Sequence, residues 1–565
     1  MTTLYERVVK AVLSIAQLLI PNWIQRFVIN KLINSEKHAR PHPFSLWTGA
    51  IAGRPNDGGT SATAQKLSPD DPVTQLKKSA NFAPSGYVSW TGLVNRRYTG
   101  RHLPPADAAY IEGLPAKERV FEELLLRKDG QFIPSGNTSS LFCFFAQWFT
   151  DSFLRTNPLD RRQNTSNHEI DYCQIYGLDG WTTNRLRERS GGRMLLENNL
   201  LPRLTQPDGA VRERFHEIGY IRARRAMENN QLPGSGLRAA LSLSLSEPLS
   251  DDRWSHMYAS GLERGNSTIL YTAISTMCLR EHNLVAGELV KIHPDWDDDR
   301  LFETARLIMV RNVLGIVVED YINHIAGIAR FKLERHFGEH ERWYRTNRIS
   351  LEFNLLYRWH SLVPDRFVVD GDDYGHKDYR FNNSLLEKHG VERCINAAST
   401  QHAGRVQLHN TPYFLEKAEL ATLDMSRTFA LQPFVAYCER FGERPPQSMM
   451  ELVGGDAKAE AELSNLYGSV DKVELPIGLI AQARSKVLPD AVLPPLITTM
   501  VGVDAFTHIL TNPVLADQVY EAAFPGELAA LADGRGGIAG LMARTAAAGT
   551  TVTPSFTVRT PLACD

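Results

Sequence analysis

The stretch EFNLLYRWHSLVPDRF, residues 352–367, places a tyrosine and a histidine three residues apart among large apolar side chains. On a helix, residues at this spacing share a face, so Tyr357 and His360 are expected side by side. The apolar neighbours indicate burial. A buried neutral imidazole with no carboxylate nearby in the sequence is a good metal ligand, although a lone core histidine is more often a hydrogen-bonded structural group.

A second stretch, residues 140–155, predicts a buried helix that carries two polar groups. Gln147 and Asp151 are four residues apart and share one face, and phenylalanines and a tryptophan surround them. A buried carboxylate without a partner costs several kcal/mol or becomes neutral. Asp151 therefore has either a chemical role or a plain ion pair with Arg155, which lies four residues further on.

Length and composition narrow the class of protein. The chain has 565 residues, enough for several domains or one large catalytic unit. A hydrophobic content of 43% and a charged content of 22% are typical of a globular protein. The net charge of −2 gives no global field that favours nucleic acid. Six scattered cysteines without a CxxC motif favour a reducing, cytoplasmic compartment.

The N-terminal region predicts amphipathic helices. In LYERVVKAVLSIAQLLIP, residues 4–21, the charged and amide side chains fall within one arc of about 100° at helical spacing. NWIQRFVINKLI, residues 22–33, adds aromatic and basic groups. The charges argue against a membrane span and favour a helix that lies in the bilayer interface. Packing on the main body is the alternative. We expect residues 1–50 to bind a membrane surface and 51–86 to form an irregular arm.

Residues 87–565 predict one mainly α-helical catalytic domain. Long periodic segments over 116–130, 139–156, 267–294 and 298–331 indicate helices, and few alternating strand patterns occur. The charged stretch LREHN, residues 279–283, predicts a structural ion-pair network within one of these helices.

Short motifs then appear in one order, and together they resemble the cyclooxygenase-like branch of the animal heme peroxidase superfamily, including fatty-acid dioxygenase relatives. The motifs are YVSW (87–90), FCFFAQWFT (142–150), EIDYCQIYG (169–177), LREHN (279–283), HPDW (293–296), LFETARLI (301–308), VVEDYINHIAG (317–327), the segment 345–360, AGR (403–405), LQPF (431–434), ELVG (451–454), LYG (466–468) and PSFTV (554–558).

The resemblance implies heme b, iron protoporphyrin IX, as cofactor, with His360 as the axial ligand of the iron. Gln147 and Asp151 then face the opposite side of the heme, and His168 lies at its edge. In such enzymes a peroxide oxidises the heme, the heme oxidises a tyrosine at the place of Tyr357, and the tyrosyl radical takes hydrogen from a fatty acid. O2 then adds to give a hydroperoxide or a related oxylipin.

The resemblance also implies a substrate channel lined by Tyr321, Ile328, Ala505 and Phe506. Two of these positions depart from the family, because Ile328 replaces a tyrosine and Ala505 or Phe506 replaces a serine. The companion carboxylate-binding arginine has no clear match, and Arg40 or Lys31 could replace it. At the place of a tyrosine that neighbours the axial histidine in the family, this chain has Pro476. A homodimer is an option that the family suggests.

The departure at Asp151 keeps three functions open, because the family has a histidine there that moves the peroxide proton. The first is a heme-dependent fatty-acid dioxygenase, which we expect. The second is a peroxide-driven peroxygenase in which Asp151 is the acid–base group. The third is a heme-binding protein of the membrane surface without efficient turnover.

Overall fold

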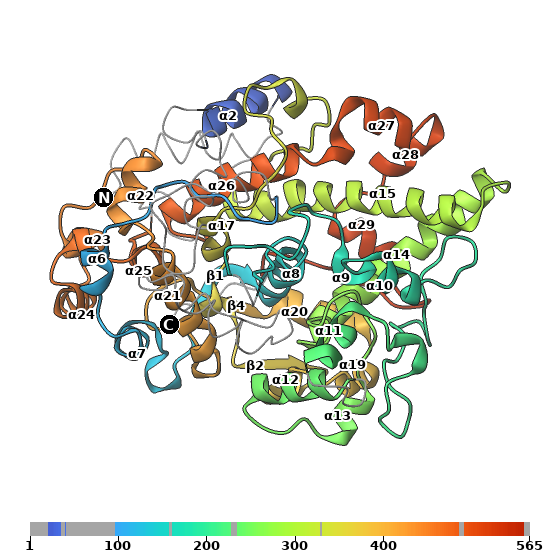
Figure 1. Ribbon diagram of the computed structural model, residues 1–565, viewed down its shortest axis with the longest axis horizontal. Helices are drawn as coiled ribbons and strands as arrows, with labels where there is room; N and C mark the ends of the chain where they lie inside the picture. The colour runs from blue at the N-terminus through green and yellow to red at the C-terminus, as the bar shows by residue number, and fades with distance from the viewer. Residues whose placement is uncertain are drawn as a thin grey trace, which may run out of the picture.

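The computed structural model describes residues 21–34, 40, 96–157, 161–227, 234–327, 330–484 and 491–558. Helices dominate this part of the chain, which confirms the predicted mainly α class (Figure 1). The proposed arm at 51–86, the first N-terminal helix and Ile328 lie outside the described residues.

Two long helices, α14 (Ile269–Ile292) and α15 (Asp298–Ile316), run through the interior of the molecule (Figure 1). Each begins at a side-chain cap, since Thr268 and Asp297 accept backbone N–H groups of the first turn. Between them α14 ends just before Pro294, which cannot continue a helix. Helix α8 (Ser140–Thr150) contacts α14 and is buried at every position except Gln147. The three predicted core helices are thus confirmed.

Helical structure continues beyond α15 through a π-helical turn, Val317–Ile322, into α16 (Asn323–Ala326). Gly327 then ends the path with a positive φ of 68°. Tyr321 lies within the π-helical turn, an element often found at functional sites. The predicted helix at 116–130 is shorter than expected, because it consists of α7 (Lys117–Val120) and a π-helical turn that ends at Leu125.

The segment that holds the tyrosine–histidine pair is not one helix, which corrects the prediction. Helix α17 (Leu351–Leu356) ends before Tyr357, and a separate 3-10 turn, His360–Leu362, begins at the histidine. Trp359 has φ −93° and ψ 51°, outside the helical region, so the backbone breaks between the two residues. Their proximity therefore depends on a turn that the tertiary structure holds, not on helical periodicity.

The other longer helices surround this interior. They are α10 (Gly180–Leu186), α11 (Gly219–Met227), α12 (Ser235–Leu245), α19 (Ser384–His389), α20 (Val391–Thr400), α21 (Glu416–Thr428), α22 (Phe434–Arg440), α24 (Ala457–Tyr467), α25 (Leu475–Ala481), α26 (Pro495–Leu510), α27 (Asp517–Ala523), α28 (Glu527–Asp533) and α29 (Ile538–Thr545).

Two short antiparallel pairs are the sheets of the described residues. β1 (Pro134–Ser139) pairs with β4 (His402–Gly404), and β2 (Arg366–Val369) pairs with β3 (Asp372–Gly375). The second pair is a tight hairpin in which Asp370 and Gly371 both adopt positive φ, the conformation that a type I′ turn needs. The first pair joins the start of α8 to the segment near His360 across a long stretch of sequence.

Helix α2 (Asn22–Asn34) confirms the second predicted N-terminal helix. Its inner face, Gln25, Ile29 and Ile33, is buried against the body and contacts α26, while Trp23 and Phe27 are 72% and 62% exposed. Among the described residues, no helix combines the length and apolar character needed to span a membrane. The exposed side chains of Trp23 and Phe27 are compatible with membrane binding by α2, which stays a prediction.

The stretch LREHN forms the ion-pair network that the sequence predicts. Glu281, fully buried on α14, contacts the guanidinium groups of Arg535 and Arg544 at 2.7 and 2.6 Å. Arg280 pairs with Glu392 of α20 at 2.7 Å. These contacts join α14 to α20, to α29 and to the loop before α29, so the stretch is structural.

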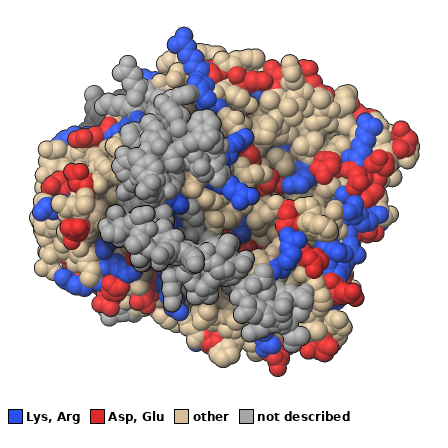
Figure 2. Space-filling view, in the orientation of Figure 1, with Lys and Arg blue, Asp and Glu red and all other residues tan. Residues whose placement is uncertain are grey.

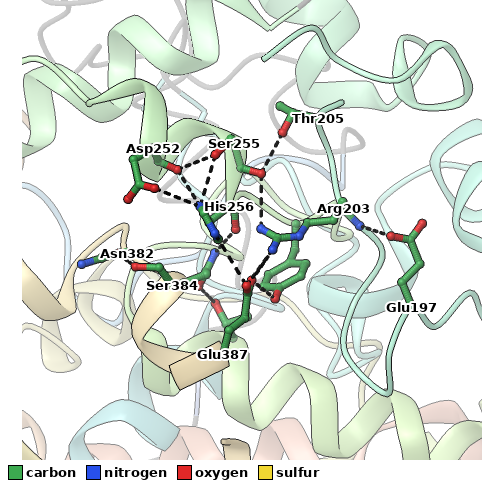
Figure 3. A network of polar contacts seen from close by, with 12 residues as sticks. Glu197, Arg203, Thr205, Asp252, Ser255, His256, Asn382, Ser384 and Glu387 are labelled. Atoms are coloured by element: carbon green, nitrogen blue, oxygen red, sulfur yellow. Dashed lines mark hydrogen bonds and ion pairs between the residues drawn. The ribbon is translucent and has the colours of Figure 1, made fainter. Parts of the chain in front are cut away.

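A polar network near the surface joins α19 to the loop before α11 (Figure 3). Glu387 accepts hydrogen bonds of 2.7 Å from Arg203 and from the Tyr258 hydroxyl, and His256 lies 3.7 Å away. On the face shown in Figure 2, Lys and Arg residues mix with Asp and Glu, in keeping with the small net charge.

Candidate active site

A cavity of about 550 Å³ separates α8 from the segment that follows α17. Gln147 and Asp151 line it from α8, and Tyr357 and His360 line it from the opposite side. The structure therefore brings together four residues that the sequence singled out in two distant segments. Leu237 and Leu241 of α12 close one side, and a cavity of this size and mixed lining suits a cofactor.

His360 faces a carboxylate on the side away from this cavity. Its Nδ1 atom lies 2.9 Å from Oε1 of Glu419, which is buried on α21. The Nδ1–H bond of His360 does not point at Oε1 of Glu419. The two atoms are therefore in close contact but do not form a well-aligned hydrogen bond. Since Nδ1 faces Glu419, Nε2 is the ring nitrogen available to a metal in the cavity.

The backbone around His360 is held from two sides. Gly404 of β4 leaves no room for a side chain, because a Cβ there would lie 1.9 Å from the carbonyl oxygen of Ser361. Arg127 donates hydrogen bonds to the carbonyls of Ser361 and Val363 and pairs with Asp365 at 2.7 Å. These contacts fix the turn that carries the histidine and explain why the AGR motif needs its glycine.

Asp151 pairs with Arg264, and not with Arg155 as the ion-pair alternative expected. Arg264 Nη1 lies 2.9 Å from Asp151 Oδ1, whereas Arg155 binds Glu263 at 3.0 Å. The second carboxylate oxygen, Oδ2, is buried and has no hydrogen-bond partner among the described residues. Burial raises the pKa of the Asp151 carboxyl above its ordinary value, and Arg264 and Arg155 oppose that rise.

Gln147 is the other polar group that α8 presents to the cavity. Its amide Nε2 donates a 3.2 Å hydrogen bond to the hydroxyl of Ser267, which also lines the cavity. This contact orients the amide and leaves its oxygen free to accept a hydrogen bond from a ligand. Gln147 and Asp151 thus form a polar wall opposite His360.

Tyr357 lies in an aromatic environment at the edge of the cavity. Its ring contacts Trp359 at 4.8 Å and meets Phe353 edge-on at 5.1 Å between centroids. Burial raises the pKa of the Tyr357 phenol, and the nearby Tyr321 hydroxyl opposes the rise. The proton therefore stays on the phenol at neutral pH, so oxidation of the ring has to be coupled to its loss.

Four of the predicted residues do not line this cavity. Tyr321 stacks on Phe142 at 4.9 Å, while Ala505 and Phe506 are buried on α26. His168 uses both ring nitrogens within the protein, since Nε2 lies 2.7 Å from the Arg96 carbonyl and Nδ1 accepts the Ile349 N–H. Ile328 lies outside the described residues. The channel role of Ile328, Tyr321, Ala505 and Phe506 stays a prediction.

The two candidates for binding a substrate carboxylate differ in their surroundings. Arg40 contacts Oδ1 of Asp504 on α26 at 2.7 Å, and His102 and Ser350 complete that buried cluster. The charge of Arg40 is thus already balanced. Lys31 is exposed on α2. A carboxylate-binding role for Arg40 would require Asp504 to give up this contact.

The residues of the cavity fit a heme group. His360 can supply an axial nitrogen from one side, and the polar wall of α8 faces it from the other. Three guanidinium groups at the border, Arg264, Arg358 and Arg380, offer positive charge to two propionates. The Arg358 side chain donates to the Asn354 amide oxygen at 2.8 Å, and its Nε has no partner among the described residues. Burial and the neighbouring Arg264 lower the pKa of Arg358 to about 10, and the charges of Glu419 and Asp151 only partly oppose this.

Sequence reasoning missed Arg264 and Glu419. Arg264 lies in a loop far from Asp151 along the chain, and nothing in its local pattern marks it. Glu419 carries a signal that could have found it, since it shares one helical face with Thr422, Leu423 and Ser426, all buried. A carboxylate on the buried face of a helix calls for a partner, here His360.

Comparison with known proteins agrees with this arrangement. The family described as Animal haem peroxidase matches residues 127–509. Prostaglandin G/H synthase 2 of Equus caballus is 32% identical over 463 residues, which cover 79% of this chain and 70% of the relative. Prostaglandin G/H synthase 1 of Mus musculus is 31% identical over 456 residues, covering 78% and 70%.

Solved structures share the fold at low identity. Fatty acid alpha-dioxygenase of Oryza sativa superposes with a TM-score of 0.67 at 14% identity and covers 99% of this chain and 97% of its own. Peroxidase A from Dictyostelium discoideum gives 0.60 at 16% identity, with 82% and 93% covered. From the family match, the identity to the synthases and the fit of the cavity to heme, we conclude that the chain belongs to the animal haem peroxidases, a family of heme-binding oxidoreductases.

Proposed function

We propose that the protein is a heme-dependent dioxygenase of unsaturated fatty acids in which Tyr357 abstracts the substrate hydrogen. The observation that carries this proposal is that Tyr357 and His360 line one cavity, opposite the polar wall of Gln147 and Asp151. The named relatives, prostaglandin G/H synthases and a fatty acid alpha-dioxygenase, support a fatty acid as substrate.

Each residue of the cavity has a task in this proposal. Bound heme supplies the oxidising power that a peroxide delivers. His360 would hold the heme iron, with Nε2 as the nitrogen that Glu419 leaves available, and Arg264, Arg358 and Arg380 would offer charge to the propionates. Gln147 and the free oxygen of Asp151 bind the peroxide and move its proton. The buried aromatic residues around Tyr357 exclude water from the radical.

The hydrogen-transfer steps involve Tyr357 alone among the protein groups. The oxidised, deprotonated phenol takes a hydrogen atom from an activated carbon, and the phenol O–H bond forms as the C–H bond breaks. O2 adds to the carbon radical. The resulting peroxyl radical takes the hydrogen atom back from Tyr357, which yields a hydroperoxide and restores the radical.

Replacing Tyr357 with phenylalanine tests the proposal. We expect Tyr357→Phe to keep the Soret absorption of bound heme and to lose O2 uptake with unsaturated fatty acids. Tyr413→Phe is the matched control, since Tyr413 is exposed and outside the cavity lining. Unchanged O2 uptake in Tyr357→Phe would remove the radical role.

A second candidate is peroxide-driven oxygen insertion, and the unpartnered Oδ2 of Asp151 favours it. In this case the product oxygen comes from peroxide instead of O2. Incubation with isotopically labelled peroxide under unlabelled air separates the two functions. Restoring the histidine of the family with Asp151→His tests the third option, because a silent heme protein should then gain peroxidase activity.

We also propose that α2 contacts a membrane surface through Trp23 and Phe27, which point away from the body. Such a protein acts at the cytoplasmic face as a monotopic or peripheral enzyme. Co-sedimentation with liposomes should fall in Trp23→Ser/Phe27→Ser, while heme absorption stays unchanged. A homodimer remains a prediction that sedimentation of the purified chain can test.

A further inference from the structure

We propose that Glu419 is a positioning residue that orients His360 and strengthens it as an iron ligand. The inference rests on the proposed role of His360 and adds to it a partner that sequence reasoning missed. A carboxylate that accepts the Nδ1–H of a ligating histidine fixes its tautomer and makes Nε2 a stronger electron donor.

The geometry around Glu419 supports this role. Oε1 lies 2.9 Å from Nδ1 of His360, and the glutamate side chain is only 3% exposed. Its nearest other polar contact is a long one, since the Thr411 hydroxyl lies 3.4 Å from the same oxygen. Within the described residues, Glu419 forms no ion pair with lysine or arginine, so the imidazole is its main partner there. A buried carboxylate is costly without a partner, so the pair is mutually dependent.

The surroundings also hold the pair in place. Glu419 lies on α21, and the same helix is fixed by Arg427, which pairs with the buried Glu474 at 2.7 Å. On the other side, Gly404 and Arg127 hold the backbone of the His360 turn. The proposal requires the imidazole to turn until Nδ1–H points at Oε1, which lies 2.9 Å away.

The consequence is an electron-rich axial ligand, which lowers the reduction potential of the iron. A carboxylate partner makes the histidine a stronger electron donor than a neutral hydrogen-bond acceptor would. Pro476, at the place where the family resemblance leads us to expect a tyrosine, offers no hydrogen-bond donor or acceptor on its side chain. The polar contact to Nδ1 of His360 comes from Glu419.

The test uses the full chain reconstituted with heme. We expect Glu419→Gln to lower the iron–histidine stretching frequency of the ferrous protein, to shift the midpoint potential to a more positive value, and to weaken heme binding about 10–100-fold. Glu419→Asp keeps the charge at a greater distance and should give a smaller shift in the same direction. It also keeps the proposal testable if Glu419→Gln does not fold.

Two control variants separate positioning from general damage. Glu416→Gln removes an exposed carboxylate from the same helix, and Glu281→Gln removes a buried one from α14. Both should leave the stretching frequency and the potential at the wild-type values, even if Glu281→Gln lowers the melting temperature. An unchanged frequency and potential in Glu419→Gln would overturn the inference.

The failure of the underlying proposal gives a different result. If the wild type shows no iron–histidine band, or if His360→Ala keeps it, then His360 is not the ligand, and the role of Glu419 falls with it. If His360→Ala loses the band and Glu419→Gln leaves it unshifted, then the heme site stands and the inference about Glu419 alone is wrong.

Discussion

Two buried carboxylates of this protein, Glu281 and Asp151, both bind arginine, yet their surroundings differ. Glu281 has both oxygens engaged by Arg535 and Arg544. Asp151 has one oxygen on Arg264 and the other without a partner among the described residues, beside the cavity. A buried carboxylate with both oxygens paired, such as Glu281, joins elements of the fold. A buried carboxylate with an unpaired oxygen beside a cavity, such as Asp151, is available for chemistry.

The largest expected effect on stability comes from removing the fully paired carboxylate of Glu281. Glu281→Gln leaves Arg544 without its carboxylate and Arg535 with Glu288 alone, and we expect it to lower the free energy of unfolding by about 3–5 kcal/mol. Urea denaturation of the folded protein measures this change. Heme absorption of the variant that remains folded should be unaltered. A loss below about 1 kcal/mol would show that Glu281 contributes no more than a surface pair.

Replacing Asp151 should instead lower the reactivity with peroxide and leave the stability of the fold unchanged. Asp151→Asn keeps the shape and the contact to Arg264 but removes the base, so we expect the rate of reaction with peroxide to fall by about 10²–10⁴-fold. Because burial raises the pKa of this carboxyl, its ionised form is disfavoured by folding, and the variant should not be less stable at neutral pH. Stopped-flow kinetics and thermal denaturation measure the two quantities. A large loss of stability with an unchanged rate would contradict the comparison.

The pH dependence of the peroxide reaction also tests whether Asp151 is the base. A carboxyl whose folded pKa is raised favours the protonated state on folding, so its contribution to stability is present at low pH and is lost as the pH rises through the folded pKa. The base is active only above that pKa. We therefore expect kcat/KM for peroxide to fall on acidification at a higher pH than an ordinary aspartate near 3.9 would cause. The acidic limb should be absent in Asp151→Asn.

The smallest expected effect concerns Arg358, a half-buried cation that forms no ion pair with a carboxylate within the described residues. If it binds a heme propionate, Arg358→Gln should weaken heme binding about tenfold or less, the loss of one charge-assisted contact. Titration of the apoprotein with heme measures the affinity. Arg366→Gln is the control, since this arginine pairs with Asp373 on the exposed hairpin. Equal affinities in all three proteins would place the propionates elsewhere.

Local pattern predicted the elements that depend on local interactions. The apolar runs of α8, α14 and α15 are long, and each helix begins at a side-chain cap, so their starts were predicted closely. The end of α14 was also predicted, whereas α8 and α15 end earlier than predicted, at Thr150 and Ile316. The segment after α17 was predicted wrongly as one helix. Its break before His360 depends on Arg127 and Gly404, which come from distant parts of the chain.

By itself the sequence determined that this protein is mainly helical, that it carries long buried helices, and that Gln147 and Asp151 share a face. These facts follow from spacing within a few residues, where backbone geometry decides which side chains meet. Only the tertiary structure decided that the two pairs face one cavity, that Asp151 binds Arg264, and that Glu419 lies behind His360. Such contacts join residues far apart in the chain, and the packing of whole helices, not local propensity, sets their distances.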